Sequence, residues 1–275
     1  HCWNIRDNMS LAPSIDNFLH THSENIGLVG IGKIAITIAI LEAEKNSKLK
    51  VKNDQNYSHA LDLNTLGDTW INRLFSILIS QKSFDNFLET LDHITFVSFN
   101  YDRCVQYFFY YAAKQYFSLD NLQAEKTLQH LKILNPYGNV GPFIGNSSRP
   151  TFGRILANPQ LVNVSKNLKT FTEGVVGEVQ EEIRDVISEA DVVAYLGFGY
   201  LPLNMQVISS NRRKATQFVV GTTKGLSRFS NKVITERLVD EIALNNSHVG
   251  QPNSVNLMDL TCSELMHEFE MMFLT

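Results

Sequence analysis

Cysteine pairs, long runs of one charge sign and membrane-length apolar runs are all missing from this chain, and each absence excludes a class of protein. The three cysteines, Cys2, Cys104 and Cys262, lie far apart and form no CxxC pair. This spacing excludes a thiolate zinc site and a disulfide framework, and it is typical of a reducing, cytoplasmic compartment. We find no signal peptide and no apolar run long enough to span a bilayer, so no membrane partner is expected.

The charge balance of the 275 residues is mildly acidic, with a formal net charge of −4. The one tight basic run, residues 212–214, is more typical of a solvated turn than of a surface that grips DNA. Direct nucleic-acid binding is therefore not expected, and a small molecule or a protein is the favoured partner. The 44% hydrophobic and 19% charged content is ordinary for a globular protein with a full core.

Two further patterns point away from familiar sites. The eight histidines form no metal-ligand spacing with nearby acids, so no metal site is expected. Residues 27–33 match the spacing of a phosphate-binding P-loop, but Ile34 stands where that loop needs a Ser or Thr hydroxyl. The preceding residues 20–25 are polar and do not read as a buried strand. We interpret residues 27–33 as the glycine-containing start of a largely buried helix over 28–43.

Short apolar runs separated by helical patterns predict an α/β fold. Strands are expected at 94–99, 133–134, 192–196 and 217–220, and helices near 15–19, 28–43, 70–78, 84–91, 105–116, 122–131, 171–187 and 265–272. Residues 139–165 are rich in glycine and proline and read as a long loop. We expect a single domain over 1–275: a parallel sheet with helices on both faces, and extra helices in the N-terminal third.

Polar residues and glycines follow the predicted strands where each strand ends. Asn100, Tyr101 and Asp102 follow the first strand, Gly197-Phe198-Gly199 follows the third, and Gly221-Thr222 follows the fourth. Because the carboxyl ends of parallel strands share one edge of a sheet, the pattern favours a nucleotide cleft there. The plainer interpretations stay open: a helix cap at Asn100 or Asp102, and a tight strand exit at the glycine turn.

A family resemblance covers about residues 10 to 225. The blocks are Phe-Asn-Tyr-Asp-Arg at 99–103, Pro-Tyr-Gly at 136–138, and Leu-Gly-Phe-Gly at 196–199 followed by Pro202 and Asn204. With residues 14–19 and Gly32-Lys33, they resemble the sirtuin-like NAD-hydrolase domains of bacterial anti-phage defence proteins. The resemblance implies a Rossmann-like fold that splits NAD into nicotinamide and ADP-ribose, and so halts an infected cell by NAD depletion (abortive infection). It also implies a homo-oligomer, a defence-system partner protein, or both.

The same resemblance implies roles for individual residues. Asn100 matches the asparagine that positions the water or ribose at the bond being cut, and Asp102 matches the acid beside it. Asn135 or Tyr137 fills the position that holds a histidine in sirtuin-like enzymes, because no histidine occurs between 131 and 247. The residues expected to line the NAD site are Phe99, Tyr101, Gly138, Gly197, Phe198, Gly199, Asn204, Gly221 and Thr222.

The departures from the family define an alternative. The family's first glycine-rich strand and turn is not visible before Ser10 and is expected upstream of residue 1. Neither Asn135 nor Tyr137 is a good base near neutral pH. The alternative is a catalytically silent nucleotide-binding or assembly module that binds NAD or ADP-ribose. Protein deacylation is the weaker third hypothesis, because zinc-carrying sirtuins hold two CxxC pairs that are missing here; no zinc is expected.

Overall fold

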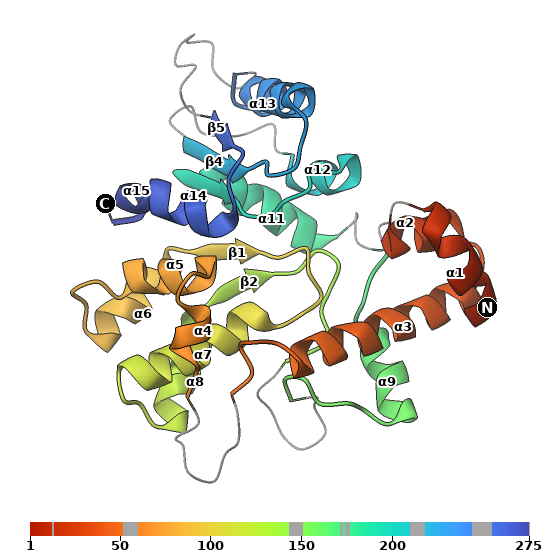
Figure 1. The fold of residues 1–275 in the computed structure, drawn as a ribbon, viewed down its shortest axis with the longest axis horizontal. Coiled ribbons are helices and arrows are strands. Elements are labelled where there is room, and N and C mark those ends of the chain that lie inside the picture. Colours follow the sequence, from red (N-terminus) through yellow and green to blue (C-terminus); the bar gives the residue numbers. More distant parts are fainter. Residues whose placement is uncertain are drawn as a thin grey trace. The chain divides into compact units, whose positions relative to one another are not determined.

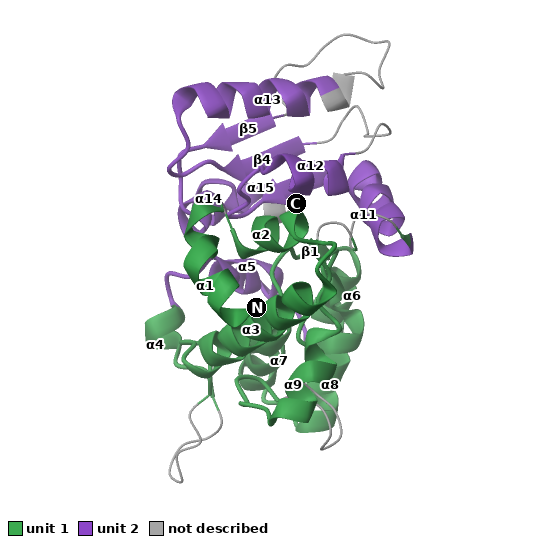
Figure 2. Cartoon of the chain, turned by 90° about the vertical axis from the view of Figure 1, so that its right-hand side faces the viewer, with its two compact units in different colours: residues 1–66, 84–177 green, residues 67–83, 178–275 purple. Residues whose placement is uncertain are grey.

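A computed structural model describes residues 1–12, 14–51, 60–142, 151–170, 173, 177–209, 218–243 and 255–274. The chain divides into two compact units (Figure 2). Unit 1 comprises residues 1–66 and 84–177, and unit 2 comprises residues 67–83 and 178–275. Each unit is mixed α/β with a short parallel sheet of its own, so the coarse prediction of an α/β chain with parallel strands is confirmed.

Unit 1 is built around a two-stranded sheet, with the element order drawn in Figure 1. Its elements are α1 (Cys2–Asn8), the 3₁₀ helix η1 (Met9–Leu11), α2 (Ile15–Thr21), α3 (Ile26–Lys45), α4 (Leu63–Leu66), α6 (Phe84–Asp92), β1 (Thr95–Val97), α7 (Cys104–Tyr116), α8 (Asn121–His130), β2 (Lys132–Leu134) and α9 (Asn158–Ser165). Strands β1 and β2 pair in parallel with Phe96 opposite Ile133, and the α7–α8 pair connects them. Aromatic packing fixes this unit: Phe87, Phe108 and Phe109 are fully buried, and Phe96 meets Phe109 edge-on.

Unit 2 holds a three-stranded parallel sheet in the order β3-β4-β5. Its elements are α5 (Trp70–Leu78), α11 (Glu178–Glu189), β3 (Val192–Tyr195), α12 (Pro202–Ile208), β4 (Phe218–Thr222), α13 (Arg228–Ala243), β5 (Val255–Met258), α14 (Cys262–Glu268) and α15 (Glu270–Leu274). Val193 lies opposite Val219, and Val220 opposite Asn256. The central strand β4 is the most buried of the three, because it lies between β3 and β5 and α14 packs on it.

Two expectations about the fold are corrected, one about the sheet and one about the loop at 139–165. The predicted strands were placed on one sheet, whereas the described strands form two hydrogen-bonded sheets in different units. The strand ends at 98–103 and 197–200 therefore belong to separate sheets. The expected loop at 139–165 ends in a helix, α9, because Pro159 at the first turn and the apolar Leu161 and Val164 favour one. Residues 143–150 of that segment and the basic run 212–214 lie outside the described residues.

Helix α3 forms where it was expected, but its burial differs from the expectation. Residues 27–33 lie inside it, and the Asn25 side chain caps its start by accepting from the Leu28 amide at 3.0 Å. Contrary to expectation, most of its apolar residues are exposed or half-buried, and Ile26 is 85% exposed. The expectation that no apolar run is long enough to span a bilayer is also corrected: among the described residues, α3 alone has the length and composition to cross a membrane, a test that core helices also pass. Its Lys33 and Glu44 contact other residues of unit 1.

Candidate functional site

The loop that follows β1, residues 98–103, holds the first group of predicted site residues. The Asn135 amide group donates to the Ser98 carbonyl at 3.1 Å and to the Asn100 carbonyl at 3.3 Å. The Asn100 backbone N–H in turn donates to the Ser98 hydroxyl at 3.3 Å. Asn100 is exposed, and its own side-chain amide makes no hydrogen bond within the described residues. The backbone of Asn100 is thus fixed on both sides, and its side chain stays available.

Asp102 has a structural role in this loop. Its carboxylate accepts from the Cys104 backbone N–H at 2.9 Å, at the first turn of α7. Burial and the neighbouring Asp102 carboxylate raise the pKa of the Cys104 thiol, which is therefore neutral. Asp102 thus accepts from the first amide of α7, as the helix-cap interpretation expected, although the cap residue itself is Arg103, which makes no side-chain cap hydrogen bond. An acid at a helix start also favours the positive end of the helix dipole.

Tyr101 is almost fully buried, and its hydroxyl is committed to a carboxylate. The hydroxyl donates to Asp16 of α2 at 2.7 Å and more weakly to the Lys169 carbonyl at 3.4 Å. Burial, followed by the Asp16 charge, raises the pKa of Tyr101 well above its ordinary value of 10. Asp16 was missed as a contact residue. The only signal for it in the sequence was an acid in the first turn of a helix capped by Ser14, whose hydroxyl accepts from the Asn17 amide.

Arg103 ends the loop in a fully buried ion pair with Glu44 of α3. One Glu44 oxygen accepts from Arg103 Nε at 2.9 Å and from the Arg103 backbone at 3.1 Å, and the other accepts from the Gly153 backbone at 2.9 Å. The guanidinium also reaches the carbonyls of Pro142 and Thr151. Every oxygen of this buried carboxylate is thus used, which is the condition for keeping a charge in a protein interior.

The segment after β2 completes the group in unit 1. The Asn135 side-chain oxygen accepts from the Asn139 amide group at 2.9 Å, so both ends of the Asn135 amide are occupied. Tyr137 is 4% exposed and packs edge-on against Phe99, and burial raises its pKa above its ordinary value of 10. Gly138 adopts φ +74°, and a side chain there would collide with the Asn167 carbonyl. The positive φ and the close Asn167 carbonyl therefore explain why position 138 is a glycine.

The carboxyl edge of the unit 2 sheet holds the second group. Thr222, at the end of β4, accepts from the Gly197 backbone N–H at 2.8 Å, and its hydroxyl points toward the Tyr195 carbonyl at 3.5 Å. Burial raises the pKa of the Cys262 thiol, against a hydrogen bond with Thr222 that lowers it. Gly197 has φ +61°, as a tight strand exit requires, so that interpretation is confirmed for this residue.

Tyr200 is the unusual residue of this edge. It is a bulky residue with φ +51°, in the left-handed region, and it is 6% exposed. Its ring lies within 5.7 Å of Tyr195 and 5.2 Å of Phe198, centroid to centroid, and its hydroxyl packs against Gly221. Gly221 lacks a side chain because Tyr200 and Leu257 fill that space. The Tyr200 hydroxyl is buried and has no hydrogen-bond partner in the described chain.

Three other predicted site residues, Phe198, Gly199 and Asn204, lie in this turn or just after it. Gly199 has neither a positive φ nor a close neighbour, since an added Cβ would meet only Leu201 at 3.9 Å. Neither backbone geometry nor packing therefore requires glycine at this position. Phe198 is half-buried against Tyr195. Asn204 lies half-buried in the first turn of α12, the helix that follows the glycine turn.

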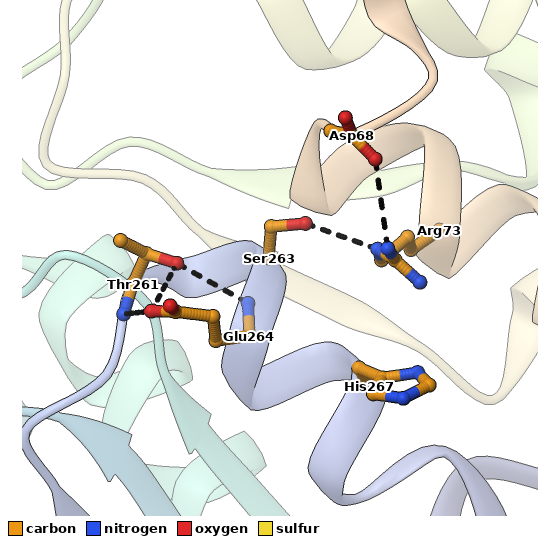
Figure 3. Close-up of a pocket in the computed structure, with 6 residues that line it drawn as sticks. All are labelled: Asp68, Arg73, Thr261, Ser263, Glu264 and His267. Atoms are coloured by element: carbon orange, nitrogen blue, oxygen red, sulfur yellow. Dashed lines mark hydrogen bonds and ion pairs between the residues drawn. The ribbon is translucent and has the colours of Figure 1, made fainter.

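A surface pocket in unit 2 was not predicted (Figure 3). It has a volume of about 310 Å³ and is lined by Asp68, Arg73, Thr261, Ser263, Glu264 and His267. Arg73 Nε donates to the Ser263 hydroxyl at 3.0 Å, and Arg73 Nη2 lies 3.7 Å from Asp68 Oδ1. Glu264 closes a capping box with Thr261 at the start of α14. Glu264 also pairs with Lys224 at 3.6 Å, so both carboxylates that line the pocket have a basic partner.

The structure therefore brings the predicted residues together in two groups. Asn100, Tyr101, Asp102, Asn135 and Tyr137 share the strand ends of unit 1, while the glycine turn, Gly221 and Thr222 share those of unit 2. Within the described residues no three His, Cys, Asp or Glu side chains gather as a metal site would need. Comparisons with family models, with curated proteins and with solved structures found no match.

Proposed function

We propose that this chain is an NAD-cleaving enzyme that splits NAD into nicotinamide and ADP-ribose, with the Rossmann-like fold of the defence-associated family it resembles. The observation that carries the proposal is the setting of Asn100. Its backbone is held by Ser98 and Asn135, and its side-chain amide lies exposed at a strand end with its hydrogen-bonding capacity unused. A fixed, unoccupied amide at that edge is suited to orient a ligand.

The chemistry asks little acid–base work of the protein. When the ribose–nicotinamide bond breaks, its electron pair goes to the pyridinium nitrogen, so nicotinamide leaves neutral without needing a proton. The sugar develops positive charge at C1′, and a water oxygen then bonds to that carbon and releases a proton to solvent. Asn100 can orient the ribose and the water by hydrogen bonds alone. The Asp102 carboxylate beside it favours the developing cation.

A specific observation favours the second candidate, a catalytically silent module that binds NAD or ADP-ribose. Both alternatives for the family's histidine position, Asn135 and Tyr137, have structural roles: Asn135 is occupied at both ends of its amide, and Tyr137 is buried against Phe99. Neither offers a base to the edge. This module would use the same strand ends for recognition and assembly, without turnover.

The test is NAD consumption by the chain and by Asn100→Ala, with Asn64→Ala, an exposed asparagine of α4, as the matched control. We expect Asn100→Ala to lower the rate about 100-fold or more, as the loss of one oriented hydrogen-bond donor does, without changing the urea midpoint. Asn64→Ala should change neither. Intact NAD in all three, with ADP-ribose binding measurable, would favour the silent module. Activity that arises only in Tyr137→His or Asn135→His would do the same.

Action in anti-phage defence by NAD depletion, the cytoplasmic location, and a homo-oligomer or defence partner belong to this proposal. They are supported by the resemblance at 99–103, 136–138 and 196–199 alone. NAD loss in phage-infected cells that express the chain, absent with Asn100→Ala, is the corresponding readout in cells.

A further inference from the structure

The turn after β3, residues 197–200, combines two costs at one residue. A tyrosine in the left-handed region of backbone space is an outlier, because its Cβ crowds the following carbonyl. Its hydroxyl has also left water for a position against Gly221, where it finds no hydrogen-bond partner in the described chain. Buried polar groups are nearly always paired, and backbone outliers concentrate where function maintains them.

The surroundings show why the costs coincide at Tyr200. Thr222 holds the Gly197 amide at 2.8 Å, so the start of the turn is anchored to β4. The end of the turn leads directly into α12, whose first residue is Pro202. Tyr200 lies between these two fixed points, and its hydroxyl lies next to Gly221 at the end of β4. The bare backbone of Gly197 and Gly199 is exposed at the same turn.

We propose that this turn is a two-state element and that Tyr200 couples it to a nucleotide. In the first state the Tyr200 hydroxyl lies buried against Gly221, with no hydrogen-bond partner in the described residues. When a ribose or phosphate oxygen binds at the exposed Gly197–Gly199 backbone, the turn opens and the Tyr200 hydroxyl donates to that oxygen. The proposal rests on the nucleotide-binding part of the proposed function but not on turnover, and it names Tyr200 as a recognition residue.

The experiment compares Tyr200→Phe with Tyr107→Phe, in thermal unfolding and in ADP-ribose binding by calorimetry. Tyr107 is a matched control in unit 1, since its buried hydroxyl accepts from the Val51 amide at 3.0 Å. Removing an unpaired hydroxyl should raise the Tm by about 2–4 °C, whereas removing the paired one should lower it. Tyr200→Phe should also weaken ADP-ribose binding about 2- to 10-fold, and Tyr107→Phe should leave it unchanged.

Two further ligands separate the sources of the oxygen: adenosine offers ribose without phosphate, and pyrophosphate offers phosphate without ribose. The ligand whose binding is weakened by Tyr200→Phe identifies the acceptor. A lower Tm for Tyr200→Phe, or an unchanged affinity for ADP-ribose, overturns the proposal, as does an absence of ADP-ribose binding to the unmodified chain. A chain that binds ADP-ribose through Tyr200 but leaves NAD intact overturns only the cleavage hypothesis. If the chain cleaves NAD but Tyr200→Phe binds ADP-ribose with unaltered affinity, only the proposal for Tyr200 is overturned.

Discussion

The loop after β1 and the turn after β3 occupy equivalent places at the carboxyl ends of parallel strands, yet they are held in opposite ways. Around Asn100 the neighbouring polar side chains are satisfied: Tyr101 by Asp16, Asp102 by the start of α7, and Arg103 by Glu44. At 197–200 a bulky residue has a strained backbone and its hydroxyl is buried without a partner. The comparison teaches that the polar side chains of the first strand end are satisfied within the chain, whereas the second strand end carries the energetic costs of a left-handed tyrosine backbone and an unpaired buried hydroxyl.

The largest expected loss of stability tests how the loop after β1, residues 98–103, is held in place. Glu44→Ala leaves the Arg103 guanidinium buried without its counter-charge and removes the acceptor of the Gly153 amide. Breaking a buried pair in this way costs about 3–5 kcal/mol, which urea unfolding would measure. Asp7→Ala, which breaks the exposed Arg6–Asp7 pair, should cost less than about 1 kcal/mol. A loss below about 1 kcal/mol for Glu44→Ala would show that Arg103 does not fix the loop.

The next largest effect on stability is expected at Gly138 and Gly197, one glycine at each strand end, both of which have a positive φ. An alanine at 138 would collide with the Asn167 backbone carbonyl, whereas an alanine at 197 would make only an ordinary 3.5 Å contact with Cys262 Sγ. Gly197→Ala should therefore cost about 1–2 kcal/mol from the left-handed backbone alone, and Gly138→Ala about 1–3 kcal/mol more from overpacking. Equal urea midpoints for the two variants would contradict the contrast between a tight and an open strand end.

The contrast also shows how much the sequence could predict. The strands at 95–97, 132–134, 192–195 and 218–222 were expected within a few residues, because short apolar runs that stop on polar residues or glycine are a strong local signal. Helix starts were predicted where a side chain makes a local bond, as at Ser14. Strand β5 was missed because Val-Asn-Leu-Met lacks a β-branched run, and α13 because its apolar residues do not cluster on one face.

The long-range partners could not be predicted, because no local pattern connects residues far apart in the chain. Glu44 lies 59 residues before Arg103, and Asp16 lies 85 residues before Tyr101. Both acids looked like ordinary helix-surface residues until the fold paired them. Conversely, Gly221 suggested close approach of a ligand, whereas the structure assigns its empty space to Tyr200 and Leu257. The roles predicted for Asn100 and the other site residues stay predictions.

The smallest expected effect distinguishes the two strand ends by pH. Near the β1 loop, burial works to raise the pKa of Glu173, but hydrogen bonds from Lys33 and from the Thr170 amide outweigh it, and the pKa falls below 4.5. A lowered carboxylate pKa contributes stability that is present above the unfolded pKa and is lost as pH falls through the folded pKa. Lys33→Met should therefore lower the urea midpoint only slightly at pH 7, by an amount worth less than about 1 kcal/mol. This difference should shrink progressively below pH 4.5.

The Tyr200→Phe effect should stay constant over the same range, because burial, then Tyr195 and Cys262, raise the pKa of Tyr200 and keep it protonated. A Lys33→Met difference that persists in acid would mean that Lys33 acts through packing, and a Tyr200→Phe effect that varies with pH would mean that the second strand end is also held by charge.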